Sequence, residues 1–241
     1  MTVKPPIIFK PQSLIKKGLN LHFVFDIQQL PQSILKELEQ QNSDLNDFTQ
    51  LILVAHAGKP LWETLAVNGM TQLQKQSSDP IDDFTVSSIN GWFKQHHPTL
   101  NKKIIYPSTL PTPLQALGQL AHWHHPSPFL VGINNLYGTW FAYRAAVLCN
   151  SDFITSEPIK SQSPCTSCSS KACITQCPAQ AVSEVAFNMD ACLQYRLKEN
   201  SLCQHTCLAR VACPVGKSQQ YTDEQIRYHY GVSLKMIHSV K

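Results

Sequence analysis

Eight of the nine cysteines in this 241-residue chain fall in one short segment, between Cys165 and Cys213. Thiolates are strong ligands for soft and borderline metals, so such crowding indicates either metal binding or disulfide bonds. Residues 1–6 lack the apolar run and the small-residue cleavage site of a secretory signal. We therefore expect a cytoplasmic protein, in which thiols stay reduced, and favour a metal over disulfides.

The spacing of these cysteines is typical of an iron–sulfur protein. Residues 165–178 read Cys-x2-Cys-x4-Cys-x3-Cys-Pro, and a second set ends in Cys213-Pro214. Bacterial two-cluster ferredoxins carry Cys-x2-Cys-x2-Cys-x3-Cys-Pro, and the last cysteine of that run binds the other cluster. We predict two [4Fe–4S] clusters whose ligand sets interleave. One set is Cys165, Cys168, Cys173 and Cys213, and the other is Cys177, Cys192, Cys203 and Cys207.

Zinc is the main alternative for these ligands. Zinc ribbons pair two Cys-x2-Cys knuckles, however, and this chain has only one, at Cys165 and Cys168. The ligand assignment is weakest at residues 169–172 and 203–213, where the spacing departs from that of ferredoxins. The ninth cysteine, Cys149, lies in an apolar segment, and we expect it to be an inert buried thiol.

Composition fits a soluble globular protein, with 43% hydrophobic and 15% charged residues. No apolar run is long enough to cross a membrane. The formal net charge is +4 with neutral thiols. Eight thiolates and two 2+ cluster cores would bring it to about zero. Basic residues are also scattered, so a nucleic-acid partner is not expected.

We expect three parts along the chain. Residues 1–155 form an α+β domain that binds a cofactor, residues 156–217 a small ferredoxin-like domain with two clusters, and residues 218–241 a helical tail. The first boundary rests on the abrupt rise in cysteine content and on the Ser- and Pro-rich stretch at residues 156–164.

Hydrophobic periodicity predicts the elements of the first domain. Strands or buried segments are expected at residues 21–27, 51–55, 104–106, 130–133 and 140–148, and helices at 31–41, 61–65, 84–96 and 114–125. Asp79 and Pro80 form a helix-start signal, and Thr222 to Gln225 has the spacing of a capping box for a last helix. On the predicted helix at 114–125, His122 and His125 would share a face, although solvated histidines at a helix end are the commoner explanation.

The cysteine segment resembles the C-terminal region of epoxyqueuosine reductase, a cobalamin-dependent iron–sulfur enzyme of tRNA modification. The likeness covers about 60 residues and includes a lone cysteine 15 positions after the first Cys-Pro, at Cys192. The chain departs from that family between Cys168 and Cys173, and around Cys207. The catalytic motifs of that family are not recognised here, which argues against a tRNA substrate.

The N-terminal part is similar to cobalamin-trafficking and decyanating proteins of the CblC type. The matching stretches are residues 79–83 (Asp-Pro-Ile-Asp-Asp), 137–144 (Tyr-Gly-Thr-Trp-Phe-Ala-Tyr-Arg) and 221–225 (Tyr-Thr-Asp-Glu-Gln). Both families have a modified nitroreductase-like fold, so the resemblance implies α+β architecture, a sheet flanked by helices and a homodimer. It also implies that Arg144 lies in the corrinoid pocket.

Three further residues are candidates for cofactor binding. Gly138 and Trp140 belong to the same motif as Arg144, and an indole ring suits a planar cofactor as well as a hydrophobic core. His56 follows the predicted strand at 51–55, where a loop would present it to a ligand. A buried arginine such as Arg144 needs an anionic partner, which a structural ion pair would also supply.

These observations predict an oxidoreductase whose two clusters pass electrons to a cobalamin-type cofactor. A flavodoxin or ferredoxin would supply the electrons, and a small-molecule cofactor would receive them. Two alternatives stay open at this point. The chain could be an electron carrier whose N-terminal domain docks a partner, or flavin could occupy the pocket in place of cobalamin.

Overall fold

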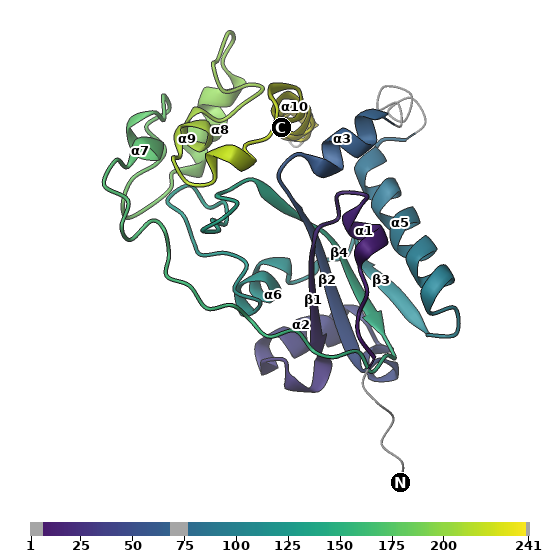
Figure 1. Ribbon diagram of the computed structural model, residues 1–241. Helices are drawn as coiled ribbons and strands as arrows, with labels where there is room; N and C mark the ends of the chain where they lie inside the picture. Colours follow the sequence, from purple (N-terminus) through teal and green to yellow (C-terminus); the bar gives the residue numbers. More distant parts are fainter. Residues whose placement is uncertain (1–6, 68–76, 240–241) are drawn as a thin grey trace. The chain divides into compact units, whose positions relative to one another are not determined.

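The computed structural model describes residues 7–67 and 77–239, and these form two compact units (Figure 1). The described residues within Met1–His122 and Phe141–Ile159 make up the first, which we call the sheet unit. Those within Trp123–Trp140 and Lys160–Lys241 make up the second, which contains eight cysteines and which we call the cysteine unit. Residues 123–140, from the middle of the sequence, thus belong with the cysteines.

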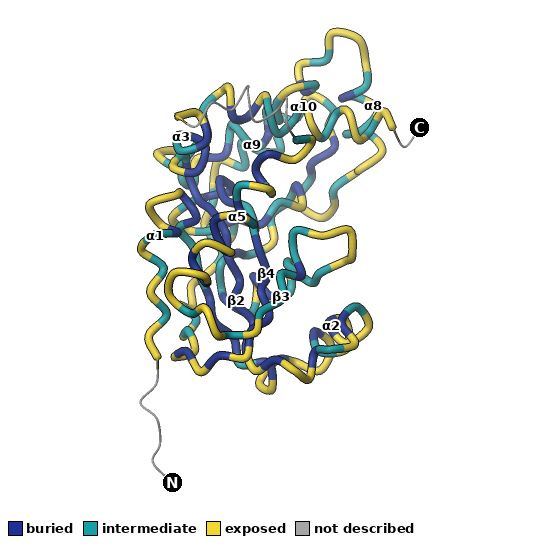
Figure 2. The backbone as a smooth tube through the Cα atoms, turned by 90° about the vertical axis from the view of Figure 1, so that its right-hand side faces the viewer, coloured by how far each residue is buried: buried dark blue, intermediate teal, exposed yellow. Residues whose placement is uncertain are grey.

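A four-stranded antiparallel sheet is the centre of the sheet unit, with strand order β1-β2-β4-β3. The strands are β1 (Leu21–Asp26), β2 (Gln50–Ala57), β3 (Lys102–Tyr106) and β4 (Phe141–Cys149). All eight residues of β2 are buried (Figure 2), and its apolar run at residues 51–55 is typical of a strand covered on both faces. The α+β class predicted from the sequence is confirmed.

Helices cover both faces of β4. On one face α5 (Pro80–His96) packs against the strand. On the other, α6 (Leu114–Leu120) comes so close that a Cβ at Gly118 would meet the Tyr143 hydroxyl. Successive side chains of a strand point to opposite faces, so Tyr143 points toward α6 and Arg144 toward α5. A register shift between Val54 and Ala55 of β2 precedes His56, which pairs with Ala142 on the Arg144 face.

The remaining helices are short, apart from α10. In the sheet unit they are α1 (Gln12–Ile15), α2 (Gln32–Gln41) and α3 (Pro60–Val67), with 3-10 turns at Ile27–Gln29 and Leu45–Asp47. In the cysteine unit they are α7 (Ala172–Thr175), α8 (Met189–Leu197), α9 (Leu208–Ala212) and α10 (Asp223–Ser239), with a 3-10 turn at Lys217–Gln219. The cysteine unit therefore depends on loops and side-chain contacts more than on regular structure.

Two predicted elements are wrong in extent or type. Residues 130–133 form no strand, and only Ile133 makes an isolated bridge, to His125. The helix expected over 114–125 ends at Leu120, because His122 takes a left-handed backbone (φ 54°) that no helix continues. His122 and His125 therefore do not share a helix face.

The two predicted helix starts differ in how they are capped. Asp79 is the N-cap of α5, with Pro80 in the first turn, but its side chain makes no capping bond, and Ser78 donates to the carboxylate instead. At α10 the Gln225 backbone N–H donates to the Thr222 hydroxyl at 3.2 Å, as the capping box predicts. The reciprocal half is missing, since Gln225 Oε1 is buried without a hydrogen-bond donor among the described residues.

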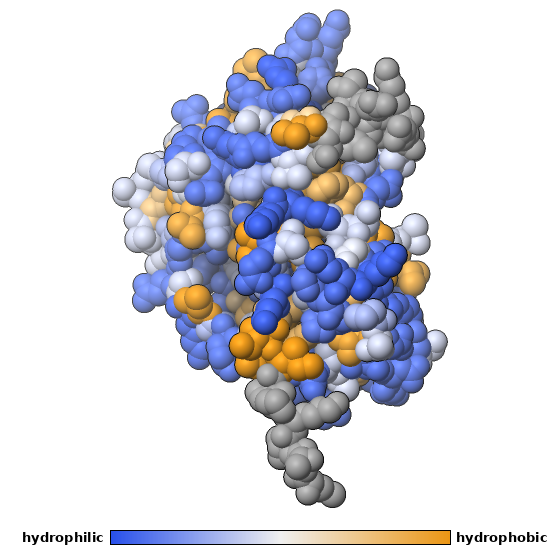
Figure 3. Space-filling view, turned by 45° about the vertical axis from the view of Figure 1, so that its right-hand side comes forward, coloured by the Kyte–Doolittle hydropathy of each residue, from blue (hydrophilic) through white to orange (hydrophobic). Residues whose placement is uncertain are grey.

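The surface carries hydrophobic side chains in separate groups. On the face shown in Figure 3 these groups (orange) lie among hydrophilic side chains. Within the described residues, no helix combines the length and apolarity needed to cross a bilayer.

The first prediction concerns His22 on β1. Burial removes water from this imidazole and lowers its pKa from 6.5 to about 4, although a hydrogen bond to the Leu19 backbone opposes the shift. Its Nε2 has no hydrogen-bond partner within the described chain. The unfolded chain therefore takes up a proton before the folded chain does as pH falls. The resulting contribution of His22 to the free energy of unfolding is present in full above pH 6.5 and is lost by about pH 4. It amounts to at most about 3 kcal/mol.

Urea unfolding at pH 7 and pH 4.5 tests this, with His22→Phe as the comparison. The native chain should lose more stability between the two pH values than the variant does. Equal losses in both proteins would contradict the assignment.

Candidate metal and cofactor sites

Four cysteines from three separate stretches of the chain line one cavity of the cysteine unit. The cavity measures about 130 Å³, and its thiol-bearing residues are Cys177, Cys192, Cys203 and Cys207. Most of the other lining residues are apolar or small, among them Phe129, Pro178 and Ala209. We call these four residues the second cysteine set.

The other four cysteines line a narrower cavity of about 20 Å³ in the same unit. They are Cys165, Cys168, Cys173 and Cys213, which we call the first cysteine set. Ile133, Pro164 and Val215 supply apolar walls. The structure thus groups Cys213 with cysteines that precede it by 40 to 48 positions.

Two short helices explain this grouping. Helix α7 contains Cys173 of the first set and is followed by Cys177 of the second. Helix α9 begins after Cys207 of the second set and ends at Cys213 of the first. The two helices pack against each other, and Ala209, fully buried between them, belongs to their shared core. Each helix therefore carries one cysteine to each cavity, and the prolines that follow, Pro178 and Pro214, redirect the chain.

Helix α8 positions Cys192, which stands apart in sequence from the other cysteines of its set. The Asn188 side chain accepts a hydrogen bond from the Ala191 N–H at 3.0 Å and caps the helix. Cys192 then falls in the first helical turn, with Arg196 four residues further on the same face. Both residues line the cavity of the second cysteine set.

Burial and the neighbouring thiols make most of these cysteines harder to deprotonate. Burial raises the pKa of Cys165, Cys173, Cys192, Cys203 and Cys213, and the neighbouring thiols of the same set raise it further. The exception is Cys168, whose pKa is lowered by hydrogen bonds from Ser170 and the backbone. A cation that binds here must displace protons, so binding should weaken as pH falls.

The cysteine sulfurs of each set lie spread around their cavity. Across the described ranges, no three His, Cys, Asp or Glu side chains converge closely enough to hold one ion. Around one zinc the sulfurs would lie about 3.8 Å apart, given Zn–S bonds of about 2.3 Å. A cubane instead offers each thiolate a separate iron corner, which spreads the four ligands more widely.

A different polar cluster lies in the sheet unit, beneath α5. Arg144 Nε donates to His56 Nδ1 at 2.9 Å, and Arg144 Nη1 lies 3.6 Å from Asp82 Oδ1. Burial raises the pKa of Asp82 and of Tyr106, and the Arg144 charge opposes both shifts. The cluster therefore brings together a cation, an imidazole and two oxygen groups. The sequence had predicted that His56 lies in a loop after the strand. That prediction is wrong, because β2 continues to Ala57 and includes His56.

Gly138 and Trp140 belong to the cysteine unit and not to this cluster. Trp140 is fully buried, with the Arg210 guanidinium 4.5 Å from its ring centroid and Tyr221 beside it. Gly138 has φ +58°, and a Cβ there would lie 2.1 Å from the Val215 carbonyl oxygen. Of the four predicted cofactor residues, the structure joins only His56 and Arg144. A cofactor role for the other two stays a prediction.

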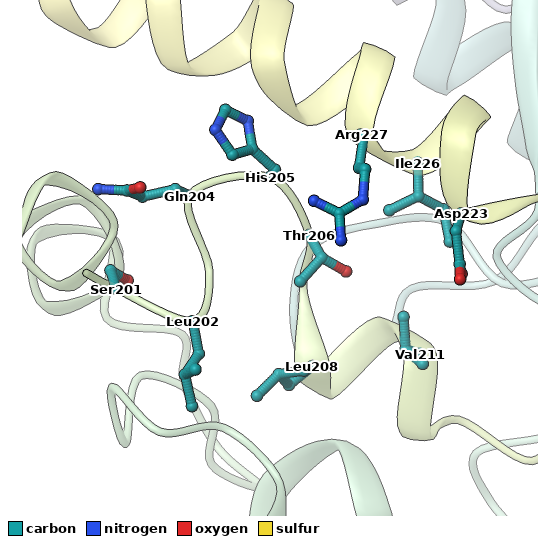
Figure 4. A pocket seen from close by; sticks show the side chains of 10 residues that line it. All are labelled: Ser201, Leu202, Gln204, His205, Thr206, Leu208, Val211, Asp223, Ile226 and Arg227. Atoms are coloured by element: carbon teal, nitrogen blue, oxygen red, sulfur yellow. The ribbon is translucent and has the colours of Figure 1, made fainter.

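A more polar pocket of about 300 Å³ lies beside the second cysteine set (Figure 4). The three residues between Cys203 and Cys207 line it, together with part of α10. Figure 4 shows Arg227 of α10 directed toward Thr206, with Leu202 and Leu208 forming an apolar side. This pocket brings cationic and apolar groups to the loop that carries two cysteines.

Three residues of these sites were not predicted from the sequence: Asp82 and Tyr106 in the sheet unit and Arg196 in the cysteine unit. Asp82 stands in the Asp-Pro-Ile-Asp-Asp stretch, so its position was visible but its pairing with Arg144 was not. The position of Arg196 could have been predicted from the sequence, because it follows Cys192 by one helical turn. The position of Tyr106 follows only from the strand register, which pairs it with Ala146 on the same face as Arg144.

No family model matches this chain, and no curated protein matches it. Several solved structures are similar. Epoxyqueuosine reductase from Bacillus subtilis has a TM-score of 0.52 at 13% identity, over 88% of this chain and 66% of that chain. A selenomethionine-labelled epoxyqueuosine reductase gives 0.53 at 14% identity, with the same coverage. The C. elegans B12-trafficking protein CblC gives 0.45 at 12% identity, over 94% of this chain and 92% of that chain.

Both families that the sequence resembles are thus among the similar structures. At these identities the reductases share the fold with this chain, and the chain spans just under two thirds of their length. The nitroreductase-like and ferredoxin-like details of the predicted fold remain predictions.

The second prediction tests why residue 138 is glycine. Gly138→Ala should destabilise the cysteine unit by more than 1 kcal/mol, because the left-handed backbone and the Val215 carbonyl both exclude a Cβ. Gly91→Ala is the matched control. Nothing lies within 4 Å of a Cβ at Gly91 in α5, so alanine should stabilise the protein by about 0.5–1 kcal/mol. Thermal unfolding measures both effects, and a neutral Gly138→Ala would refute the packing explanation.

Proposed function

We propose that this chain is an iron–sulfur oxidoreductase that binds two [4Fe–4S] clusters in its cysteine unit and passes electrons to a cobalamin-type cofactor. The observation that carries the proposal is the sorting of eight cysteines into two four-thiol cavities. Four thiolates per site are the ligand set of a [4Fe–4S] cluster. Small residues at the cavity walls, such as Ala172 and Ala209, leave room for inorganic sulfide.

The second cavity suits a low-dielectric redox centre. Its walls are largely apolar, and Cys203 is buried. Burial of this kind limits access of water to a cluster and helps set its potential. The first cavity is narrower, so its ligands have to spread when a cluster enters.

The proposed cofactor site is the cluster of Arg144, His56, Asp82 and Tyr106 in the sheet unit. A corrinoid would supply a cobalt centre that accepts single electrons. Arg144 would bind its anionic or amide oxygens through charge-assisted hydrogen bonds. His56 would hold the Arg144 guanidinium in place by accepting its Nε–H. Support for this end of the proposal comes from the resemblance of residues 137–144 to the CblC type.

The partners follow from the same reasoning. A flavodoxin or ferredoxin is the proposed electron donor, because each [4Fe–4S] cluster takes one electron at a time. We further propose a homodimer in the cytoplasm, as the resemblance implies. A solved epoxyqueuosine reductase structure contains an epoxyqueuosine-modified tRNA stem loop. The function proposed for this chain does not include a tRNA substrate.

A specific observation favours the electron-carrier alternative. Arg144 already has Asp82 and His56 as partners, so its burial can be explained without any ligand. In that case the sheet unit would serve to dock a partner enzyme, and the clusters would be the whole redox machinery.

The third prediction tests the two clusters and their interleaving. The reconstituted chain should contain about eight irons and eight labile sulfides, and each single Cys→Ser ligand variant about four of each. Cys213→Ser should leave the same EPR spectrum as Cys165→Ser, and Cys177→Ser the same as Cys192→Ser. The reason is that each pair lines one cavity.

Cys149→Ser is the control for that series, because Cys149 is buried in β4, outside both cavities. It should keep all eight irons. Zinc without sulfide would refute the proposal, and a match between Cys213→Ser and Cys192→Ser would refute the interleaved assignment.

The fourth prediction tests the proposed cofactor site in the sheet unit. The reconstituted chain should bind hydroxocobalamin with a change in its visible spectrum. Arg144→Ala should weaken that binding about tenfold or more, the effect of losing one charge-assisted hydrogen bond. Arg227→Ala removes an exposed arginine from the other unit and should leave the affinity unchanged. Binding of flavin instead of corrinoid supports the flavin alternative, and binding of neither supports the electron carrier.

A further inference from the structure

Arg196 is a buried cation that has only neutral partners among the residues the structure describes. Its side chain donates to the carbonyl oxygens of Cys203, Gln204 and Tyr230 and to the Ser233 hydroxyl, at 3.0–3.4 Å. The residue is 8% exposed, and no carboxylate within the described ranges pairs with it. A buried guanidinium without an anion costs several kcal/mol, so its position calls for a negative charge nearby.

Among the described residues that line this cavity, the candidates for that charge are the cysteine sulfurs, since no Asp or Glu lines it. Arg196 lines the cavity of the second cysteine set, and its guanidinium hydrogen-bonds to the backbone of Cys203 itself. With all four thiolates and a 2+ core, the bound cluster would carry a net charge of about −2.

We infer that Arg196 is the counter-charge of the second cluster and holds its reduction potential above the value that a neutral side chain would allow. This inference rests on the proposed function. When the second cluster takes one electron from a flavodoxin- or ferredoxin-type donor, its core charge falls from 2+ to 1+ and no bond or proton is exchanged. A fixed cation close to the sulfurs favours the more negative, reduced state.

Among the described residues that line the cavity of the first cysteine set, none is a buried cation. The charged residue in its cavity wall is Lys171, which is partly exposed, and Lys217 nearby is exposed and donates to the Val211 carbonyl oxygen. Water and salt screen exposed charges much more than buried ones. Arg196 therefore distinguishes the two clusters electrostatically.

The test is a redox titration of the reconstituted full chain followed by EPR, after its iron and sulfide content has been measured. Arg196→Gln keeps part of the hydrogen bonding but removes the charge. The midpoint potential of the second cluster should shift downward, while that of the first stays unchanged. Cys165→Ser, which retains only the second cluster, provides the background in which this signal is assigned.

Two further variants separate charge from structure. Arg196→Lys keeps the charge but loses most of the four hydrogen bonds, and should keep the potential close to that of the native chain. Lys235→Gln removes an exposed charge from α10 that lines none of the three cavities described above, and should leave both potentials unchanged.

The outcomes distinguish the inference from the proposed function. If Arg196→Gln loses the second cluster and Arg196→Lys keeps it at its native potential, the inference is supported. Equal shifts in both Arg196 variants, or loss of the cluster from both, would mean that the hydrogen bonds matter and the charge does not. An unshifted potential in Arg196→Gln with eight irons would overturn the inference and leave the proposed function intact. A native chain without iron and sulfide would overturn the proposed function itself.

Discussion

The packing of two short helices, α7 against α9, is the contact on which the cysteine unit depends. Each helix has a cysteine of one set near one end and a cysteine of the other set near its other end. When the helices lie side by side, the eight thiols sort into two groups of four that do not follow sequence order. Ala209 in the shared core allows this close approach, since a larger side chain would push the helices apart. Separation of the two helices would disrupt both thiol cavities together.

The two units treat buried positive charge in different ways. In the sheet unit Arg144 is paired with a carboxylate, Asp82, and with His56, so its charge is compensated within the protein. In the cysteine unit Arg196 meets only neutral acceptors among the described residues, beside a cavity lined by four thiols. Arg144 is thus explained by an ion pair within the protein, whereas Arg196 indicates an anionic ligand in the neighbouring cavity. The difference lies in the partners and not in the degree of burial.

Rigid positioning of the proposed cofactor residues comes from the sheet. Strand β2 is buried along its whole length, and β4 lies between it and β3. Because β4 is held on both sides, the side chains of Arg144 and Tyr143 have fixed and opposite directions. Gly118 then lets α6 approach one face of the strand, while α5 brings Asp82 to the other. The register shift before His56 matters here because it sets which face of the sheet this imidazole occupies.

The sequence by itself determined the cysteine pattern, the approximate positions of β1 to β4, and helices α2, α3, α5 and α10, because ligand spacing and hydrophobic periodicity are local properties. It did not predict the short helices α1, α7, α8 and α9, whose few residues carry little periodicity. It also supported an interleaved pairing, through the two Cys-Pro endings, and the structure places the same sets of four together. Three features needed the tertiary structure: the assignment of residues 123–140 to the cysteine unit, the end of α6 before His122, and the pairing of Arg144 with Asp82. The physical reason is common to them. Burial, left-handed turns and ion pairs depend on which distant segment packs against a residue, and the spacing of neighbours along the chain does not contain that information.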